Sequence, residues 1–289
     1  MDATTGDSLD TPHSHPETRL NYFAMPSITN GYALLDESQV LPEEKFEANF
    51  VGLSSRLYVA PWRSLFIAKK LNEVKIPTEC THTILRWEWE IPEINDVILR
   101  SNVKNVFCTS TGRRCPLKSY LYPDFVKPEI EDEEPKLGVF LMGWANNELR
   151  KSILKNYGGQ FSVTLRDSYY NYDESRNKAR ENEYVQGLSQ CSFALCPKGV
   201  GSGTRRFWEA LAAGAIPILI SDEFELPNIW DWSNTIVRVS EKRALYVPNV
   251  LHHVTIFKGV EEKRKMCRLA HKFFSEPVNI RKYIKNVIC

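Results

Sequence analysis

The stretch CPKGVGSGTRRFWEALAAGAIPILISDEFELP, residues 196–227, contains the end of an apolar strand, a glycine-rich loop, a helix and a second apolar strand. The loop holds Gly199, Gly201 and Gly203, and the helix is expected to begin near Thr204. Glycine lets the backbone approach a ligand closely. The first amide groups of a helix carry partial positive charge, which suits a phosphate. The stretch therefore predicts a strand–loop–helix unit that binds a diphosphate.

Three charged side chains follow this loop. Arg205 and Arg206 fall in the first helical turn, where the helix dipole disfavours cations, so we expect at least one of them to face an anion. Glu209 stands one turn later, where its carboxylate could accept hydrogen bonds from the ribose hydroxyls of a nucleotide. A surface ion pair with Arg205 is the alternative that the spacing leaves open. The loop is G-x-G-x-G without a following Gly-Lys-Ser/Thr, which disfavours dinucleotide and ATP loops.

Apolar strands and helical segments alternate after about residue 135. The predicted strands are 137–143, 161–166, 191–197, 215–221 and 234–240, and the predicted helices are 145–157, 181–190 and 204–214. Strands that are apolar on both faces imply a parallel sheet covered by helices on both sides. We therefore predict a Rossmann-like domain over 131–250, with its ligand at the carboxyl ends of the strands. Residues 251–289 have helical apolar spacing.

The first half of the chain has a less regular pattern. Residues 1–20 are polar and predict a disordered tail. Residues 21–130 are expected to form the acceptor-side domain. Its predicted strands are 56–61 and 104–110, and its predicted helix is 62–75. The acidic segment 127–136, bounded by prolines, predicts a connection between the two domains.

Composition narrows the class of protein. With 37 Lys+Arg and 36 Asp+Glu the net charge is +1, which disfavours nucleic acid as a partner. The seven cysteines are scattered and odd in number, so free thiols are expected and a structural metal is not. No signal peptide and no run of about 18 apolar residues is found, so we expect no membrane span. A cytoplasmic protein is the prediction.

Residues 196–227 resemble the donor-binding signature of the exostosin family of glycosyltransferases, as do WDWSN (230–234) and FLMGWANNELRKSIL (140–154). The resemblance implies a GT-B fold, in which two Rossmann-like domains flank a cleft and C-terminal helices pack back on the N-terminal domain. It also implies inverting transfer from a UDP-sugar to a glycan hydroxyl without a metal or other cofactor. The chain contains no Asp-x-Asp, which agrees with metal-independent chemistry.

The same resemblance implies roles for individual residues. Ser202, Gly203, Arg205 and Arg206 would contact the diphosphate, with Arg150 near the phosphates. Glu209 would contact the ribose, and Glu225 would face the hydroxyls of the donor sugar. Gly143 and Lys198 complete the implied donor site.

Inversion requires a general base that takes the proton from the acceptor hydroxyl. Glu88 lies between Trp87 and Trp89, and rings beside carboxylates suit sugar binding. On an alternating strand, however, Glu88 shares a face with Glu90, and that face could equally lie in solvent. Asp167, after the strand at 161–166, is the second candidate, and Glu88 is the first.

Family members in animals and plants usually carry a membrane anchor, so its absence here suggests a short viral or bacterial member, with a xylosyltransferase as the specific expectation. Two alternatives remain open. One is a non-catalytic subunit that binds a glycan or nucleotide sugar beside a partner enzyme. The other is a GT-B fucosyltransferase that uses GDP-fucose. The motifs leave the donor sugar, the acceptor, the linkage and the oligomeric state open.

Overall fold

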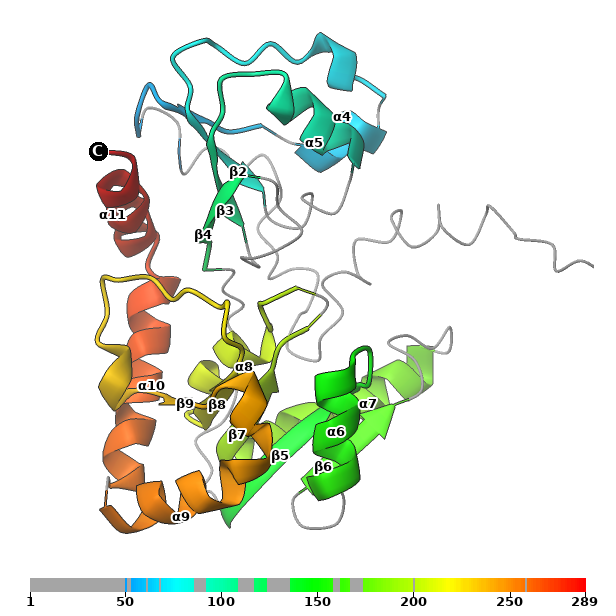
Figure 1. Ribbon diagram of the computed structural model, residues 1–289, viewed down its shortest axis with the longest axis vertical. Coiled ribbons are helices and arrows are strands. Elements are labelled where there is room, and N and C mark those ends of the chain that lie inside the picture. Colours follow the sequence, from blue (N-terminus) through cyan, green and yellow to red (C-terminus); the bar gives the residue numbers. More distant parts are fainter. Residues whose placement is uncertain are drawn as a thin grey trace, which may run out of the picture.

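The computed structural model describes residues 50, 53–60, 62–67, 69–85, 92–108, 117–123, 136–157, 162–166, 174–199, 201–257 and 259–289. These residues form two parallel sheets with helices against them, and two successive C-terminal helices run from one sheet to the other (Figure 1). The predicted tail and nearly all of the predicted acidic connection lie outside the described residues, as do Glu88, Glu90 and Asp167.

The N-terminal sheet has the order β1-β2-β3-β4, and every pair is parallel. Its strands are β1 (Leu57–Tyr58), β2 (His82–Leu85), β3 (Asn105–Cys108) and β4 (Lys118–Leu121), and its helices are α4 (Trp62–Ile67), α5 (Pro92–Leu99) and the 3-10 helix η2 (Leu71–Glu73). The helix predicted over 62–75 is wrong in its second half. Lys69 has a positive φ of 56°, a conformation that an α-helix does not contain, and α4 has already ended.

The C-terminal sheet has the order β6-β5-β7-β8-β9 and is parallel throughout, as predicted. Its elements in chain order are β5 (Lys136–Trp144), α6 (Glu148–Tyr157), β6 (Ser162–Arg166), α7 (Glu174–Ser189), β7 (Cys191–Pro197), α8 (Arg206–Ala212), β8 (Ile216–Ile220), the 3-10 helix η4 (Trp232–Asn234) and β9 (Val237–Arg238). The chain moves from β5 to β6 on one side and then returns to place β7 on the other. The direction in which successive strands are added to the sheet therefore reverses between β5 and β7, and this position is a topological switch point.

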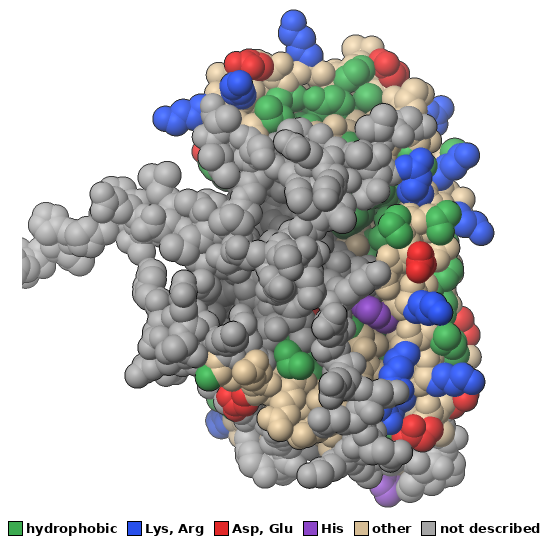
Figure 2. Space-filling view, turned by 180° about the vertical axis from the view of Figure 1, so that it is seen from behind, with side chains coloured by type: hydrophobic (Ala, Val, Ile, Leu, Met, Phe, Trp, Pro, Cys, Tyr) green, Lys and Arg blue, Asp and Glu red, His purple; other side chains and the backbone are tan. Residues whose placement is uncertain are grey.

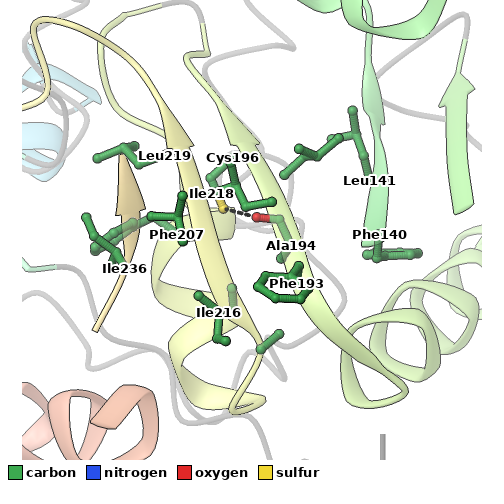
Figure 3. Close-up of a cluster of buried hydrophobic side chains, with 14 of the residues drawn as sticks. Phe140, Leu141, Phe193, Ala194, Cys196, Phe207, Ile216, Ile218, Leu219 and Ile236 are labelled. Atoms are coloured by element: carbon green, nitrogen blue, oxygen red, sulfur yellow. Dashed lines mark hydrogen bonds between the residues drawn. The ribbon is translucent and has the colours of Figure 1, made fainter. Parts of the chain in front are cut away.

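The core of this sheet is closed on both faces. Every residue of β7 and β8 is buried, and Figure 3 shows side chains of these strands beside Phe140, Phe207 and Ile236. This two-sided burial explains why the strand sequences lack polar alternation.

The WDWSN segment contributes to packing. Trp232 stacks on Phe274 with ring centroids 5.3 Å apart, and Trp208 of α8 lies 5.7 Å from the same ring. The indole N–H of Trp232 donates to the Pro227 carbonyl. These contacts show that the motif joins α8 to a C-terminal helix.

The C-terminal helices are α9 (Val247–Phe257), α10 (Val260–Ser275) and α11 (Pro277–Ile288), preceded by the 3-10 helix η5 (Glu241–Tyr246). Helical structure was predicted from residue 251, so it begins earlier than expected. Helix α11 packs Tyr283 and Ile284 against Ile84 and Phe107 of the N-terminal sheet, which confirms the predicted return of the C-terminus (Figure 1). Ile229, after β8, contacts the cores of both sheets. Two parallel α/β units connected by α11 and Ile229 agree with the predicted GT-B class. The cleft expected between the two domains stays a prediction.

The outward faces of α10 and α11 carry lysine side chains, and α10 also exposes Glu261 and Glu262. The exposed lysines are Lys265, Lys272, Lys282 and Lys285, and Figure 2 shows Lys and Arg side chains along the edge where these helices lie. Within the described ranges, no helix has the length and apolar character needed to cross a membrane. The six cysteines in those ranges are free thiols, as expected.

Candidate functional site

The carboxyl ends of β5 and β7 lie side by side at the switch point, and Arg150 of α6 bridges to one of them. Its Nε donates to the Lys198 carbonyl at 2.9 Å and its Nη2 to the Pro197 carbonyl at 3.2 Å. The side chain is 8% exposed. Arg150 is therefore held at the end of β7 by backbone acceptors.

Arg206 approaches the same edge from α8. Its Nη2 donates to the Met142 carbonyl of β5, and its Cζ lies 5.7 Å from the centre of the Tyr184 ring. A Cβ added at Gly143 would lie 2.7 Å from the Nη2 of Arg206 and 3.7 Å from the Nη1 of Arg150. The guanidinium groups of Arg150 and Arg206 therefore both lie beside Gly143. Two buried positive charges are thus close together at the switch point.

The glycine-rich loop is folded tightly onto itself. The amide of Gly199 donates to the Gly203 carbonyl at 3.0 Å, and the Ser221 hydroxyl donates to the Ser202 carbonyl at 2.7 Å. Thr204 and Arg205 form a turn, so α8 begins at Arg206, two residues later than predicted. Ser202 and Gly203 are buried within the loop.

Asn147 also holds this loop, and sequence reasoning missed its role. Its side-chain amide donates to the carbonyls of Lys198 and Gly199 at 3.2 and 2.9 Å. Its Oδ1 accepts from the amide of Arg150 at 2.9 Å, which caps the start of α6. The predicted helix 145–157 placed Asn147 inside the helix, whereas α6 begins at Glu148 and Asn147 is its N-cap.

Glu209 is buried, with 5% of its surface exposed, so the alternative of a surface ion pair with Arg205 is wrong. The Tyr184 hydroxyl donates to its Oε2 at 2.5 Å. Burial raises the pKa of Glu209, while the Tyr184 hydrogen bond, Arg205 and Arg206 oppose that rise. Burial and the nearby carboxylate also raise the pKa of Tyr184 well above its usual value. The sequence did not predict the hydrogen bond between Tyr184 and Glu209, because an aromatic residue on a helix indicates a core position first.

Lys198 is engaged by a carboxylate far away in sequence. Its ammonium forms an ion pair with Oε2 of Glu241, at the start of η5. Oε1 of Glu241 accepts from the Asp222 amide at 3.2 Å, and the Asp222 carboxylate accepts from the Glu241 amide at the same distance. This cluster ties the loop after β7 to the loop after β8.

Glu225 lies in the loop after β8 and is exposed. Arg238 holds this loop by donating to the Phe224 carbonyl at 2.6 Å and the Ser221 carbonyl at 3.3 Å. The charge of Glu225 helps Tyr120, the larger influence, to raise the pKa of Lys118 on β4. Glu225 is therefore close enough to the N-terminal sheet to act on it electrostatically.

The structure thus gathers most of the predicted donor-site residues around the ends of β5 and β7. They are Gly143, Arg150, Lys198, Ser202, Gly203, Arg205, Arg206 and Glu209. Glu225 stands apart, after the neighbouring strand β8. A pair of cations beside a carboxylate, at the switch point of a parallel sheet, can bind a ligand that carries both an anion and hydroxyl groups.

Comparison with known proteins agrees with this chemistry. An exostosin GT47 domain is matched over residues 97–254, more than half of the chain. The chain is 32% identical over 100 residues to an exostosin-1 homolog of Caenorhabditis elegans, covering 34% of this chain and 26% of that protein. It is 30% identical over 105 residues to exostosin-1c of Danio rerio, covering 36% of this chain and 14% of that protein. The matches thus span about a quarter of these relatives or less.

Among solved structures, a chain of the GtfA/B complex aligns with 72% of this chain and 45% of its own length, at 10% identity and a TM-score of 0.31. The domain match identifies the family independently of that alignment. The chain belongs to the exostosin GT47 family.

Proposed function

We propose that this protein is an inverting, metal-independent glycosyltransferase that transfers a sugar from a UDP-sugar to a hydroxyl group of a glycan. The proposal rests mainly on the position of Arg150 and Arg206, which both lie beside Gly143 at the switch point of a parallel sheet. Glu209 is buried near Arg206. Nucleotides bind at this place in open α/β sheets. Membership of the exostosin GT47 family supports the reaction class.

Each group has a defined task in this proposal. When the bond between the donor sugar and UDP breaks, negative charge develops on the diphosphate, and the two arginines stabilise that charge. The loop at Ser202 and Gly203 borders the diphosphate, and Glu209 accepts hydrogen bonds from the ribose. The acceptor oxygen attacks the opposite face of the sugar, so the configuration inverts. Its proton passes to a carboxylate base, for which Glu88 and Asp167 remain the candidates.

The donor is tested by a thermal-shift screen with UDP-xylose, UDP-galactose, UDP-glucuronate, UDP-N-acetylglucosamine and GDP-fucose, each with and without EDTA. We expect UDP-sugars to raise the melting temperature equally in both conditions, because ligand that binds only the folded state stabilises it. UDP-xylose is our first candidate. Stabilisation by GDP-fucose alone would favour a fucosyltransferase, and loss of the effect with EDTA would contradict metal independence.

Activity is tested separately from binding by following UDP release. Arg206→Ala and Glu209→Ala should each abolish release while circular dichroism shows a folded protein. Full activity in both variants would remove the donor-site assignment. A wild-type protein that binds UDP-sugars, but releases no UDP with any glycan acceptor offered, would instead favour the non-catalytic partner subunit.

A further inference from the structure

One side chain touches both parts of the candidate nucleotide site. The Tyr184 hydroxyl donates to Oε2 of Glu209 at 2.5 Å, and the Tyr184 ring lies 5.7 Å from Cζ of Arg206. In the proposed function these two partners serve different parts of the ligand, the ribose and the diphosphate. Tyr184 lies on α7, outside the glycine-rich loop and the helix that follow β7.

The position of the Tyr184 ring is set by close packing. The ring lies 5.7 Å from that of Phe140 on β5. One turn along α7, a Cβ at Gly187 would lie 2.1 Å from the Phe140 ring, so the helix sits as close to β5 as a glycine permits. Tyr184 is 5% exposed. A ring held this firmly presents its hydroxyl to Glu209 in one direction.

The hydrogen bond also determines what Glu209 can offer a ligand. A carboxylate accepts through two oxygens, and the Tyr184 hydroxyl uses Oε2, which leaves Oε1 to accept from a ligand hydroxyl. A donor to a buried carboxylate also favours its charged form, and Tyr184 opposes the rise in the pKa of Glu209 that burial causes. An ionised acceptor forms the stronger hydrogen bond.

We propose that Tyr184 is a positioning residue for the nucleotide, whose hydroxyl orients the Glu209 carboxylate towards the ribose and whose ring seats the Arg206 guanidinium. This inference rests on the function proposed above. The contribution of the Tyr184 hydroxyl can be measured separately from that of the ring, because Tyr184→Phe removes the hydroxyl and keeps the ring. The variant should weaken recognition of the ribose and preserve recognition of the diphosphate.

The experiment measures dissociation constants of UDP, 2′,3′-dideoxy-UDP and UMP by isothermal titration calorimetry. Wild-type protein should prefer UDP to dideoxy-UDP, and this preference should fall about tenfold in Tyr184→Phe, as expected when a hydrogen bond to a charged group is lost. The preference for UDP over UMP should change less than about twofold, because the ring that faces Arg206 remains.

Tyr157→Phe is the matched control. Tyr157 is also a buried tyrosine of this domain, and its hydroxyl donates to the Ala244 carbonyl at 2.6 Å. Its variant loses a buried hydroxyl that donates to a backbone carbonyl of η5 and not to the Glu209 carboxylate. Both ligand preferences should therefore equal those of the wild type.

The outcomes are distinct. An unchanged preference for UDP over dideoxy-UDP in Tyr184→Phe would overturn the positioning role, and so would an equal loss of affinity for all three ligands, which is the pattern of a merely structural residue. In Glu209→Gln the preference should already be lost, and adding Tyr184→Phe should change it no further. Wild-type protein that binds no nucleoside diphosphate would overturn the proposed function and this inference together.

A second variant covers the case in which Tyr184→Phe does not fold. Phe140→Leu removes the ring that packs against Tyr184 and leaves every hydrogen-bonding group in place. It should lower the preference for UDP over dideoxy-UDP in the same direction. A folded Phe140→Leu protein with the wild-type preference would contradict the claim that ring packing sets the direction of the hydroxyl.

Discussion

Gly143→Ala tests the arginine pair most directly. The new methyl group would lie 2.7 Å from the Nη2 of Arg206, whereas non-bonded atoms prefer about 3.5 Å or more. The guanidinium must therefore move by roughly 1 Å from its position beside Gly143 and the Met142 carbonyl. The backbone of β5 need not move, because the obstructing atom is the end of a flexible side chain.

The size of the effect follows from the hydrogen bond to the diphosphate that the displaced Arg206 would no longer make in the proposed function. A hydrogen bond to a charged group is worth about 1.5–3 kcal/mol. At about 1.4 kcal/mol for each factor of ten, UDP should bind Gly143→Ala about 10- to 100-fold more weakly. The free energy of unfolding should fall by only about 1 kcal/mol, because alanine restricts the unfolded chain more than glycine does and offsets part of the strain.

Calorimetric titration with UDP and urea unfolding followed by circular dichroism measure the two quantities. Gly259→Ala is the control. Gly259 has a φ of 58° between α9 and α10, so alanine strains the backbone there, yet the nearest atom to its Cβ would be 3.8 Å away. It should lose about 1 kcal/mol of stability and bind UDP normally. Wild-type UDP affinity in a folded Gly143→Ala protein would refute the placement of Arg206 at the nucleotide.

Three further predictions concern charges. The raised pKa of Glu209 means that the folded protein binds more protons than the unfolded chain between about pH 4.3 and that pKa. The free energy of unfolding should therefore fall as pH rises through this window, and urea titrations of Glu209→Gln should show a flatter profile there. Glu241→Gln releases the Lys198 ammonium, so UDP should bind a few-fold more tightly, while the partly exposed ion pair contributes less than about 1 kcal/mol to stability in urea unfolding. Arg264→Met removes a buried donor to the Gly214 carbonyl beyond the end of α8, which should lower the unfolding free energy by about 1–3 kcal/mol with no change in UDP affinity measured by calorimetry.

Several elements could be predicted from sequence because their own residues carry the pattern. Strand β7 covers the predicted residues 191–197, since an unbroken apolar run fits a strand buried on both faces. Strand β4, by contrast, was missed. Its sequence, KSYL, holds two polar residues in four and becomes a strand by pairing with β3. Pairing partners distant in sequence leave no local signal.

The parallel α/β class of the C-terminal half and the glycine-rich loop, with Arg205, Arg206 and Glu209 beside it, can be read from the amino-acid pattern, because strand burial and loop composition are local properties. The burial of Glu209, its hydrogen bond to Tyr184 and the ion pair between Lys198 and Glu241 emerge only in the folded chain. These contacts join residues 25 and 43 positions apart. Their formation depends on how α7 and η5 pack against the sheet, and side-chain spacing along the chain does not encode that packing.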